Sequence, residues 1–519
     1  MDKRRIGLAA LLAALLVLAA VPATAAPASV ACDSRTNNTY EKLLECVRVE
    51  GVREHQAAFQ AIADANGGIR AAGTGGYTGS VEYVVDRLEA AGWTVALDEF
   101  PYTFFFPVIL RQLTPLEADY ESGTFSGSGT GSVTGPVIPV DINLVPPRAS
   151  TSACEAADFA GLDFSGPNDI ALIQRGTCFF YDKAFNAQEA GAEAVIIFNQ
   201  GNTPEREGLI IGNASPGEGQ EPLTIPVVGA SFAQGVSLAL PESTAFIDAR
   251  AESRPQVNVI AELPGHNDDN VVMAGAHLDS VQAGPGINDN GSGSAAMLEV
   301  AEQVSKLKPE NTLRFAWWGA EEDGLIGSTE YVTGLNQAEL DRIALYLNFD
   351  MVGSSNYVFM IYDGDESGFP APVPVPDGSI AIEDLFESYF TLIGEPYDDA
   401  EFSGRSDYEA FILNGIPAGG LFTGAEVVKT AEQQAIWGGT TGAQFDPCYH
   451  LACDTFDNVS LHALGVNTDA IALAVLTYAY STETVNGVVG QKVPGNFTLP
   501  PPAGPEGTGA GGGGFFEVQ

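Results

Sequence analysis

The feature that most constrains the fold is a regular alternation of short apolar runs and longer amphipathic stretches after Gln256. Short apolar runs bounded by turn residues are typical of buried strands, and the stretches between them have helical spacing. This alternation predicts an α/β fold, with a mostly parallel, twisted sheet flanked by helices on both faces. We expect strands at 270–276, 312–318, 343–349 and 417–422, and helices at 292–307, 380–393 and 461–480.

The composition changes along the chain and indicates several units. Helical spacing at 39–65 and 80–91 begins an α/β domain that resumes after residue 250. Between these parts Gly, Ser, Thr and Pro are frequent, and short β runs alternate with one helix, which predicts a separate, smaller α+β module. We therefore expect a signal segment at 1–25, a discontinuous main domain at 26–122 and 251–485, the inserted module at 123–250, and a flexible Pro/Gly-rich tail at 486–519.

The first residues have the pattern of an export signal. A basic start from Lys3 to Arg5 precedes an apolar run from Leu8 to Val21 and the small-residue sequence Ala-Thr-Ala at 23–25. A short membrane anchor is the alternative, but the run is below the roughly 18 to 20 residues that span hydrocarbon. We expect a secreted, extracellular protein with no membrane attachment once the signal is removed.

The six cysteines form three couples that are close in sequence: Cys32 with Cys46, Cys154 with Cys178, and Cys448 with Cys453. In an exported protein this pattern predicts three disulfides. A metal or thiol site is the alternative, but no Cys-x-x-Cys spacing occurs and the couples lie far apart.

The charge balance excludes some partners. The chain has 67 acidic and 23 basic residues and a net charge of -44. Such a charge repels nucleic acid and anionic membrane surfaces, so we expect neither as a partner. Most of the carboxylates are expected to lie on a solvated surface.

Polar residues follow three of the expected strands at the point where each strand ends. His277 and Asp279 follow the first strand, Glu321 and Glu322 follow the second, and Asp350 ends the third. The carboxyl ends of parallel strands meet at one edge of a sheet, where binding sites are found.

Two loops add Asp289, in a Gly-rich turn, and His450, between two paired cysteines. Imidazole nitrogen and carboxylate oxygen are common zinc ligands, so the set predicts a zinc site. For any one of these residues alone, a structural histidine or a helix cap is the more common explanation.

A pair of zinc ions needs a bridging group, and a carboxylate with two oxygens is suited to that role. We expect Asp289 to be the bridge, His277 and Asp350 to hold one zinc ion, and Glu322 and His450 to hold the other.

Two further carboxylates have expected roles beside the metals. Asp279 is placed to accept a hydrogen bond from the second ring nitrogen of His277, with a turn cap as the alternative. Glu321, adjacent to the ligand Glu322, is expected to act as the general base that takes a proton from the attacking water.

Five motifs in order resemble the secreted bacterial di-zinc aminopeptidases, which are relatives of the leucine aminopeptidases and aminopeptidase Y. They are Gly275-Ala-His-Leu-Asp-Ser280, Gly286-Ile-Asn-Asp-Asn-Gly-Ser-Gly293, Trp317-Trp-Gly-Ala-Glu-Glu322, Leu347-Asn-Phe-Asp-Met351 and Cys448-Tyr-His450. The resemblance implies the zinc exopeptidase fold and the same five ligands, two Zn²⁺ per chain, and Glu321 as the catalytic acid and base.

The same resemblance implies roles for two residues of the substrate site. Tyr449 would donate a hydrogen bond to the developing oxyanion. Arg405, in Gly404-Arg-Ser-Asp407, would help to bind the substrate, although Ser406 as the N-cap of a helix at 407–413 is an alternative role for this segment. The middle module, with Ile173-Gln-Arg-Gly-Thr-Cys-Phe-Phe180, resembles a protease-associated (PA) domain, in which we expect no chemistry.

Some members of the resembled family bind calcium through acidic residues near the last helix. Asp469 is present here, but Gly465 stands where a second acid is expected, so Ca²⁺ at that position is doubtful.

These features predict a zinc-dependent aminopeptidase that removes N-terminal, apolar residues from peptides and proteins through a water between two zinc ions. We expect a monomer. A carboxypeptidase of the same superfamily and a metal-free, receptor-like binding protein are the alternatives. The scarcity of basic residues near the site disfavours the first, and the complete ligand set disfavours the second.

Overall fold

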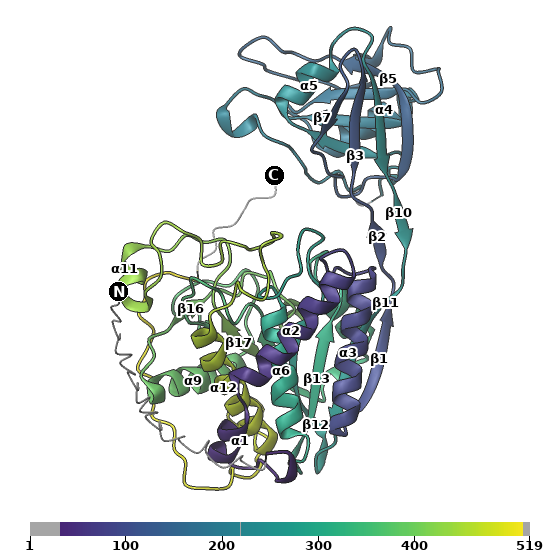
Figure 1. Ribbon diagram of the computed structural model, residues 1–519. Helices are drawn as coiled ribbons and strands as arrows, with labels where there is room; N and C mark the ends of the chain where they lie inside the picture. Colours follow the sequence, from purple (N-terminus) through teal and green to yellow (C-terminus); the bar gives the residue numbers. More distant parts are fainter. Residues whose placement is uncertain (1–31, 218, 512–519) are drawn as a thin grey trace, which may run out of the picture.

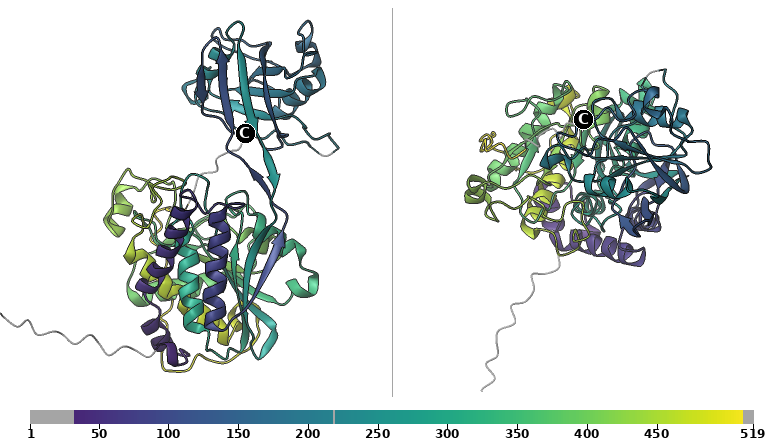
Figure 2. Two further views of the ribbon diagram at one scale, coloured as in Figure 1. Left: turned by 45° about the vertical axis from the view of Figure 1, so that its right-hand side comes forward. Right: turned by 90° about the horizontal axis from the view of Figure 1, so that it is seen from above.

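The computed structural model describes residues 32–217 and 219–511. The expected signal segment at 1–25 lies outside the described residues. Two bodies are visible in Figure 1, a large α/β domain below and a smaller, mainly β domain above, joined by a two-stranded ribbon. The ribbon consists of β2 (Thr103–Phe105) and β10 (Ala251–Ser253), and the left view of Figure 2 also shows it as the connection.

The large domain is built on an eight-stranded sheet with the order β1-β11-β13-β12-β14-β17-β15-β16. Its strands are β1 (Thr94–Phe100), β11 (Gln256–Leu263), β12 (Asn267–His277), β13 (Asn311–Trp318), β14 (Ile343–Phe349), β15 (Met360–Tyr362), β16 (Asp398–Ala400) and β17 (Ala418–Phe422). The centre, β13-β12-β14-β17, is parallel, and β1, β11 and β15 pair in antiparallel fashion with their inner neighbours. The predicted, mostly parallel sheet is confirmed.

Helices cover both faces of this sheet. They are α1 (Tyr40–Cys46), α2 (Val49–Ala65), α3 (Gly75–Ala91), α6 (Gly291–Val304), α7 (Ile326–Gly334), α8 (Gln337–Leu340), α9 (Gly378–Ile393), α10 (Glu409–Leu413), α11 (Ala431–Trp437), α12 (Leu461–Tyr480) and α13 (Glu483–Asn486), after a short 3-10 turn at Cys32–Ser34. Successive residues of a strand point to opposite faces. On β13, Trp317 donates its indole N–H to Ser294 of α6, whereas Trp318 contacts Tyr331 of α7 and Phe411 of α10. Two adjacent tryptophans thus anchor the two helical layers.

The smaller domain contains a seven-stranded sheet with the order β4-β3-β9-β5-β6-β7-β8. Its elements are β3 (Ile109–Thr114), β4 (Ala118–Tyr120), β5 (Gly131–Val140), β6 (Ile170–Gln174), β7 (Ala194–Phe198), β8 (Val227–Ala230), β9 (Thr244–Ala249), α4 (Phe180–Ala190) and α5 (Phe232–Leu238), with 3-10 turns at Ala156–Phe159 and Pro204–Arg206. The sheet starts before residue 123, where we expect the module to begin. The reason is that β3 pairs with both β4 and β9, a long-range contact with no compositional signal.

The three predicted disulfides are confirmed. Cys32–Cys46 holds the turn before α1, Cys154–Cys178 lies in the smaller domain, and Cys448–Cys453 closes a short loop of the large domain.

The described part of the C-terminal tail is packed onto the large domain. The backbone N–H groups of Gly507 and Thr508 donate to the carboxylate of Asp398, and Gly511 forms an isolated bridge with Ala400. The expectation of a flexible end therefore does not hold for this stretch, because Asp398 satisfies backbone donors that a Pro/Gly-rich sequence cannot satisfy itself.

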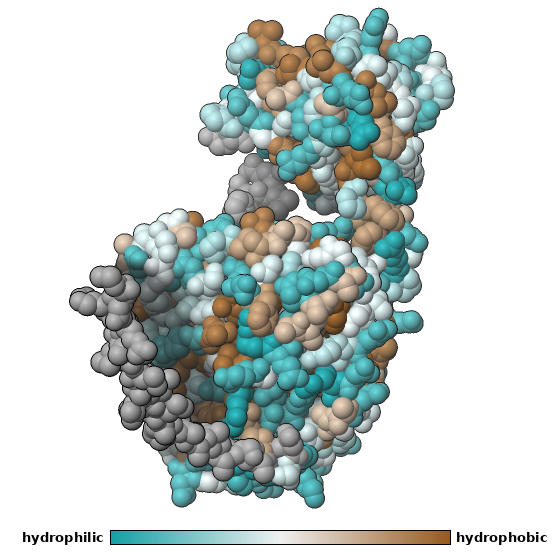
Figure 3. All heavy atoms as spheres, in the orientation of Figure 1, coloured by the Kyte–Doolittle hydropathy of each residue, from teal (hydrophilic) through white to brown (hydrophobic). Residues whose placement is uncertain are grey.

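Hydrophilic residues dominate the visible face of the large domain, with apolar residues scattered among them (Figure 3). Among the described residues, α12 is the one helix long and apolar enough to cross a membrane, and 67% of its apolar window is buried in the protein. It contacts α1, α6 and α9, so it is a core helix of the domain.

Candidate metal centre and substrate pocket

The predicted residues are brought together at the carboxyl edge of the large sheet. His277 ends β12, Glu321 and Glu322 follow β13, and Asp350 follows β14, and these three strands are neighbours. Asp289 lies in the turn that leads into α6, and His450 lies in the loop closed by the last disulfide.

The carboxylate of Asp289 lies between two imidazoles. Its Oδ1 atom is 3.2 Å from Nε2 of His277, and its Oδ2 atom is 3.3 Å from Nε2 of His450. Nε2 of His277 is also 3.3 Å from Oδ1 of Asp350, and Nε2 of His450 is 3.0 Å from Oε2 of Glu322. The side chains therefore form two groups, each with one imidazole and two carboxylates, and Asp289 belongs to both.

Glu321 lies beside the first of these groups. Its Oε2 atom is 3.7 Å from Nε2 of His277, and one oxygen of Glu321 lies within 4.8 Å of ligand atoms of both His277 and Asp350. The carboxylate thus reaches the space next to a metal held by those two residues. A water bound in that space would be within its range.

Several buried atoms of the centre have no hydrogen-bond partner among the described residues. They are both ring nitrogens of His277, Oε1 of Glu322 and Oδ1 of Asp350. Buried polar atoms are normally paired, and an unpaired one costs about 1–3 kcal/mol. Nitrogen and carboxylate oxygen donors left open in this way fit the ligand preferences of Zn²⁺.

The pKa values reflect this crowding of charge. Burial raises the pKa of Glu321 well above its ordinary value, and burial together with Asp289 raises the pKa of Glu322 to about 8. Burial opposes the charged form of His450, but hydrogen bonds with Asp289 and Glu322 raise its pKa to about 10. The cluster therefore favours an additional positive charge, as a proton or a metal ion.

Two buried side chains, those of Asp454 and Arg70, form hydrogen bonds with the backbone of the Asp289 turn. Asp454 accepts hydrogen bonds from the backbone N–H groups of Asn288 at 2.8 Å and Asp289 at 2.9 Å. Arg70, which is fully buried, donates to the backbone carbonyls of Pro285 at 2.8 Å and Gly286 at 2.6 Å. The turn is therefore fixed by side chains from distant parts of the sequence.

Asp279 links the loops after β12 and β13. Its carboxylate accepts hydrogen bonds from the backbone N–H groups of Glu321 at 3.2 Å and Glu322 at 3.4 Å. Its Oδ1 atom is 3.7 Å from Nδ1 of His277, which is longer than a hydrogen bond. Its predicted role in orienting His277 remains a prediction.

The backbone of the centre adopts unusual conformations. Ala320, Met351 and His450 have φ values of 55°, 49° and 56°, a region that non-glycine residues rarely occupy. Gly293 allows α6 to approach β14, since a Cβ atom there would lie 2.1 Å from the carbonyl oxygen of Phe349. Such strained positions are frequent at functional sites.

A pocket is lined by residues of the centre and by the apolar side chains of Met351, Phe422, Val427 and Phe445. The end of the described tail, Ala510 and Gly511, also contributes to its wall. The pocket is thus apolar next to the carboxylates, and the C-terminal segment takes part in forming it.

Arg405 and Tyr449 also line the pocket. Arg405 forms an ion pair of 2.7 Å with Glu426, and its second guanidinium nitrogen is 3.4 Å from the hydroxyl oxygen of Tyr449. The ring of Tyr449 stacks on that of His450, with 3.8 Å between the centroids. The two residues with predicted substrate roles therefore contact each other.

Ser406 has a role that the sequence did not indicate. Its hydroxyl donates a hydrogen bond of 2.7 Å to Oδ2 of Asp350 and accepts one of 2.8 Å from Asn348. The alternative prediction that Ser406 caps a helix is wrong, because α10 begins at Glu409 with Tyr408 at the N-cap. The sequence indicates neither the supporting roles of Arg70 and Asp454 nor the bond from Ser406 to Asp350, since these contacts are long-range and no motif spacing predicts them.

Comparisons with known proteins agree with this geometry. Residues 258–475 match the model of peptidase family M28, and residues 133–238 match that of the PA domain. The chain is 45% identical over 463 residues to an aminopeptidase of Pseudomonas aeruginosa, covering 87% of this chain and 85% of that protein. It is 42% identical over 381 residues to a probable leucine aminopeptidase 2 of Aspergillus fumigatus, covering 72% of each chain.

A solved structure with the same arrangement is that of BSAP, a zinc aminopeptidase from Bacillus subtilis. It superposes with a TM-score of 0.59 at 25% identity, covering 83% of this chain and 94% of that one. The fold, the order of the domains and the extent of the sequence match lead to one conclusion: the chain belongs to peptidase family M28 and carries a PA domain.

Proposed function

We propose that this protein is an aminopeptidase that removes apolar N-terminal residues from peptides and proteins with two zinc ions bound at the centre described above. The observation that carries the proposal is the position of Asp289, whose two oxygens face two different imidazoles, each with its own second carboxylate. A carboxylate placed in this way is suited to bridging a pair of metal ions.

In this proposal His277 and Asp350 would hold one zinc ion, His450 and Glu322 would hold the other, and the carboxylate of Asp289 would be shared between them. A zinc pair supplies Lewis acidity and makes water easier to deprotonate. Glu321 takes the proton of the attacking water and transfers it to the leaving amine. Its position, with Oε2 3.7 Å from Nε2 of His277, suits a carboxylate that must both accept and release that proton.

Tyr449 and Arg405 act on the substrate side. The phenol donates a hydrogen bond to the carbonyl oxygen as negative charge develops on it. Because Arg405 contacts both Glu426 and Tyr449, it positions the phenol and limits its motion.

The pocket supports recognition of an apolar side chain and a free amine. Met351, Phe422, Val427 and Phe445 provide an apolar wall, while Asp350 and Glu321 line the same pocket with carboxylates that attract an ammonium group. A carboxypeptidase would need a free cation for the C-terminal carboxylate, and the one arginine among the residues lining this pocket is paired with Glu426.

The export signal predicted from the sequence, together with the three disulfides, supports action outside the cell, on the N-termini of peptides and proteins. We propose that the PA domain takes no part in the chemistry, since the centre lies entirely in the large domain.

The test compares leucine p-nitroanilide with its N-acetylated form, and wild type with Glu321→Gln, with Glu330→Gln as control because that residue is exposed on α7. We expect cleavage of the free-amine substrate alone. The kcat of Glu321→Gln should be about 10²-fold to 10⁴-fold lower than that of wild type, which is the range typical for loss of a general base. The variant should keep its zinc. The control should equal wild type.

Equal cleavage of both substrates, or release of C-terminal residues from unblocked peptides, would contradict the proposed specificity. Loss of zinc in Glu321→Gln would instead make Glu321 a ligand rather than the base.

A further inference from the structure

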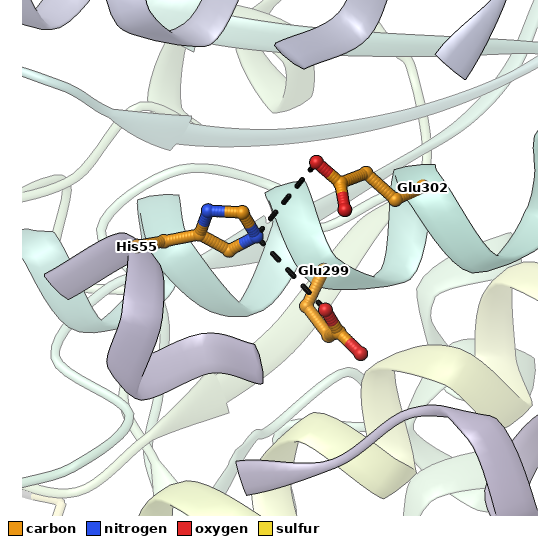
Figure 4. A group of neighbouring side chains, drawn as sticks. All are labelled: His55, Glu299 and Glu302. Carbon is orange, nitrogen blue, oxygen red and sulfur yellow. Dashed lines mark ion pairs between the residues drawn. The ribbon is translucent and has the colours of Figure 1, made fainter. Parts of the chain in front are cut away.

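Two groups of buried carboxylates lie outside the site described above, and they differ in charge balance. In the first, Nε2 of His55 lies 3.9 Å from Glu299 and 4.0 Å from Glu302 (Figure 4). Arg87 forms an ion pair of 2.6 Å with Glu302. This group therefore already contains a cation, and it is explained as a link between helices α2, α3 and α6.

The second group has no such cation. It consists of Asp363, Asp365, Glu383, Glu387 and Asp399, which we call the carboxylate cluster. The two first residues follow β15, the two glutamates lie one turn apart on α9, and Asp399 lies on β16. In the described part of the chain no ion pair joins any of the five to a lysine, arginine or histidine.

The carboxylate oxygens of the cluster converge. Ligand atoms of Asp363, Asp365 and Glu383 lie within 4.8 Å of one another, and so do those of Glu383, Glu387 and Asp399. Glu383 belongs to both groups and joins them. All but Asp365 are less than a tenth exposed.

Asp399 has an atom that the protein leaves unpaired. The residue is 4% exposed, and its Oδ1 atom has no hydrogen-bond partner among the described residues. Its Oδ2 atom lies against Gly368, where a Cβ atom would be 2.5 Å from it and 3.2 Å from Oδ2 of Asp363. A glycine is therefore required for the two carboxylates to approach each other.

In two members of the cluster, burial raises the pKa to neutral pH or above. Burial, with the charges of Asp365 and Glu387, raises the pKa of Glu383 to about 9. Burial, with the charge of Asp363, raises the pKa of Asp399 to about 7. The same environment favours a divalent cation, which would neutralise the carboxylates in place of protons.

We propose that the carboxylate cluster is a calcium site, separate from the zinc centre. All five side chains are oxygen donors, and Ca²⁺ takes six to eight oxygen ligands with flexible geometry. Zinc sites use histidine or cysteine, which this cluster lacks, and Mg²⁺ prefers few carboxylates with several waters.

The local sequence supports this choice of metal. Asp363, Asp365 and Gly368 stand at the spacing of the Asp-x-Asp/Asn-x-Asp/Asn-Gly start of an EF-hand calcium loop, with Ser367 at the third ligand position and Pro374 where that loop has its glutamate. The Asp363 carboxylate accepts hydrogen bonds from the backbone N–H groups of Ser367, Gly368 and Phe369, so the loop is wrapped around it.

The proposed site lies behind the wall of the substrate pocket. Tyr362 and Ala400, which line the pocket, are the immediate neighbours of Asp363 and Asp399 in the sequence. β15 and β16 pair with Met360 opposite Asp398 and Tyr362 opposite Ala400. A calcium ion that joins the two strands to α9 would therefore fix this wall.

The test uses the full chain loaded with zinc and passed through a chelating resin, then dialysed against Ca²⁺. The variant is Glu383→Gln with Asp399→Asn, which keeps the shape of both side chains. The control is Glu299→Gln, a buried carboxyl of the other group. Bound calcium is counted by mass spectrometry, and the Tm is measured with and without Ca²⁺.

We expect wild type and control to bind one calcium ion per chain beyond their zinc, and the double variant to bind it at least about 100-fold more weakly, since two charged ligands are lost. Ca²⁺ should raise the Tm of wild type but not of the variant. Without Ca²⁺ the variant should have the higher Tm, because Gln and Asn are buried without the proton uptake that the raised pKa values of Glu383 and Asp399 require at neutral pH.

Absence of bound calcium in zinc-loaded wild type would overturn the proposal, as would equal calcium binding by the double variant. The zinc count, measured in the same samples, distinguishes this result from a failure of the zinc centre.

Discussion

Replacing Asp454 with asparagine tests whether its hydrogen bonds to the backbone fix the Asp289 turn. Asp454 accepts two backbone N–H groups, from Asn288 at 2.8 Å and Asp289 at 2.9 Å. A hydrogen bond to a charged group contributes about 1.5–3 kcal/mol. Asparagine keeps one acceptor and places an NH₂ group against the other donor, so we expect a loss of about 2–3 kcal/mol, or roughly 30-fold to 150-fold in an equilibrium or rate.

Because Asp454 touches neither metal nor substrate, its effect must pass through Asp289. Zinc affinity and kcat/KM for leucine p-nitroanilide should each decrease by a factor within that range. Added zinc should restore part of the activity. Asp323→Asn is the control, since the carboxylate of Asp323 accepts a hydrogen bond from the hydroxyl of Tyr102 and not from the Asp289 turn. A kcat/KM within about 3-fold of wild type, with unchanged zinc affinity, would refute the reasoning.

Three further changes have defined outcomes. Arg405→Ala should lower kcat about 10-fold or more, yet change the free energy of unfolding by less than about 1 kcal/mol, because its ion pair with Glu426 is exposed; kinetics and denaturant unfolding measure the two. Burial raises the pKa of Asp469 to about 7, so the folded protein keeps a proton that the unfolded chain releases near pH 4. Stability therefore falls between about pH 4 and 7, and Tm measured across this range should fall less in Asp469→Asn. Replacing Cys448 and Cys453 by serine should cost about 2 kcal/mol of stability for so short a loop and weaken zinc binding, measured by unfolding and metal titration.

The sheet and most of the centre could be predicted because the signals are local. Apolar runs indicate the strands, and the residue that follows a parallel strand is placed at the functional edge by topology alone. His277, Glu322 and Asp350 come together for that reason, since β13, β12 and β14 are adjacent.

The supporting residues could not be predicted because their contacts join distant parts of the chain. Arg70 reaches the Asp289 turn from more than 200 positions away, and Asp454 reaches it from 165. The pairing of β3 with β9, which enlarges the smaller sheet, is of the same kind. The packing of the tail on Asp398 also depends on a contact that a Pro/Gly-rich composition does not indicate.

The most direct test of the proposed centre is a crystal structure of the zinc-loaded protein with anomalous diffraction data at the zinc edge. The account predicts two peaks about 3.5–4 Å apart. One should lie between His277 and Asp350 and the other between His450 and Glu322, with Asp289 contacting both. A single peak, or two peaks that do not share Asp289, would contradict it.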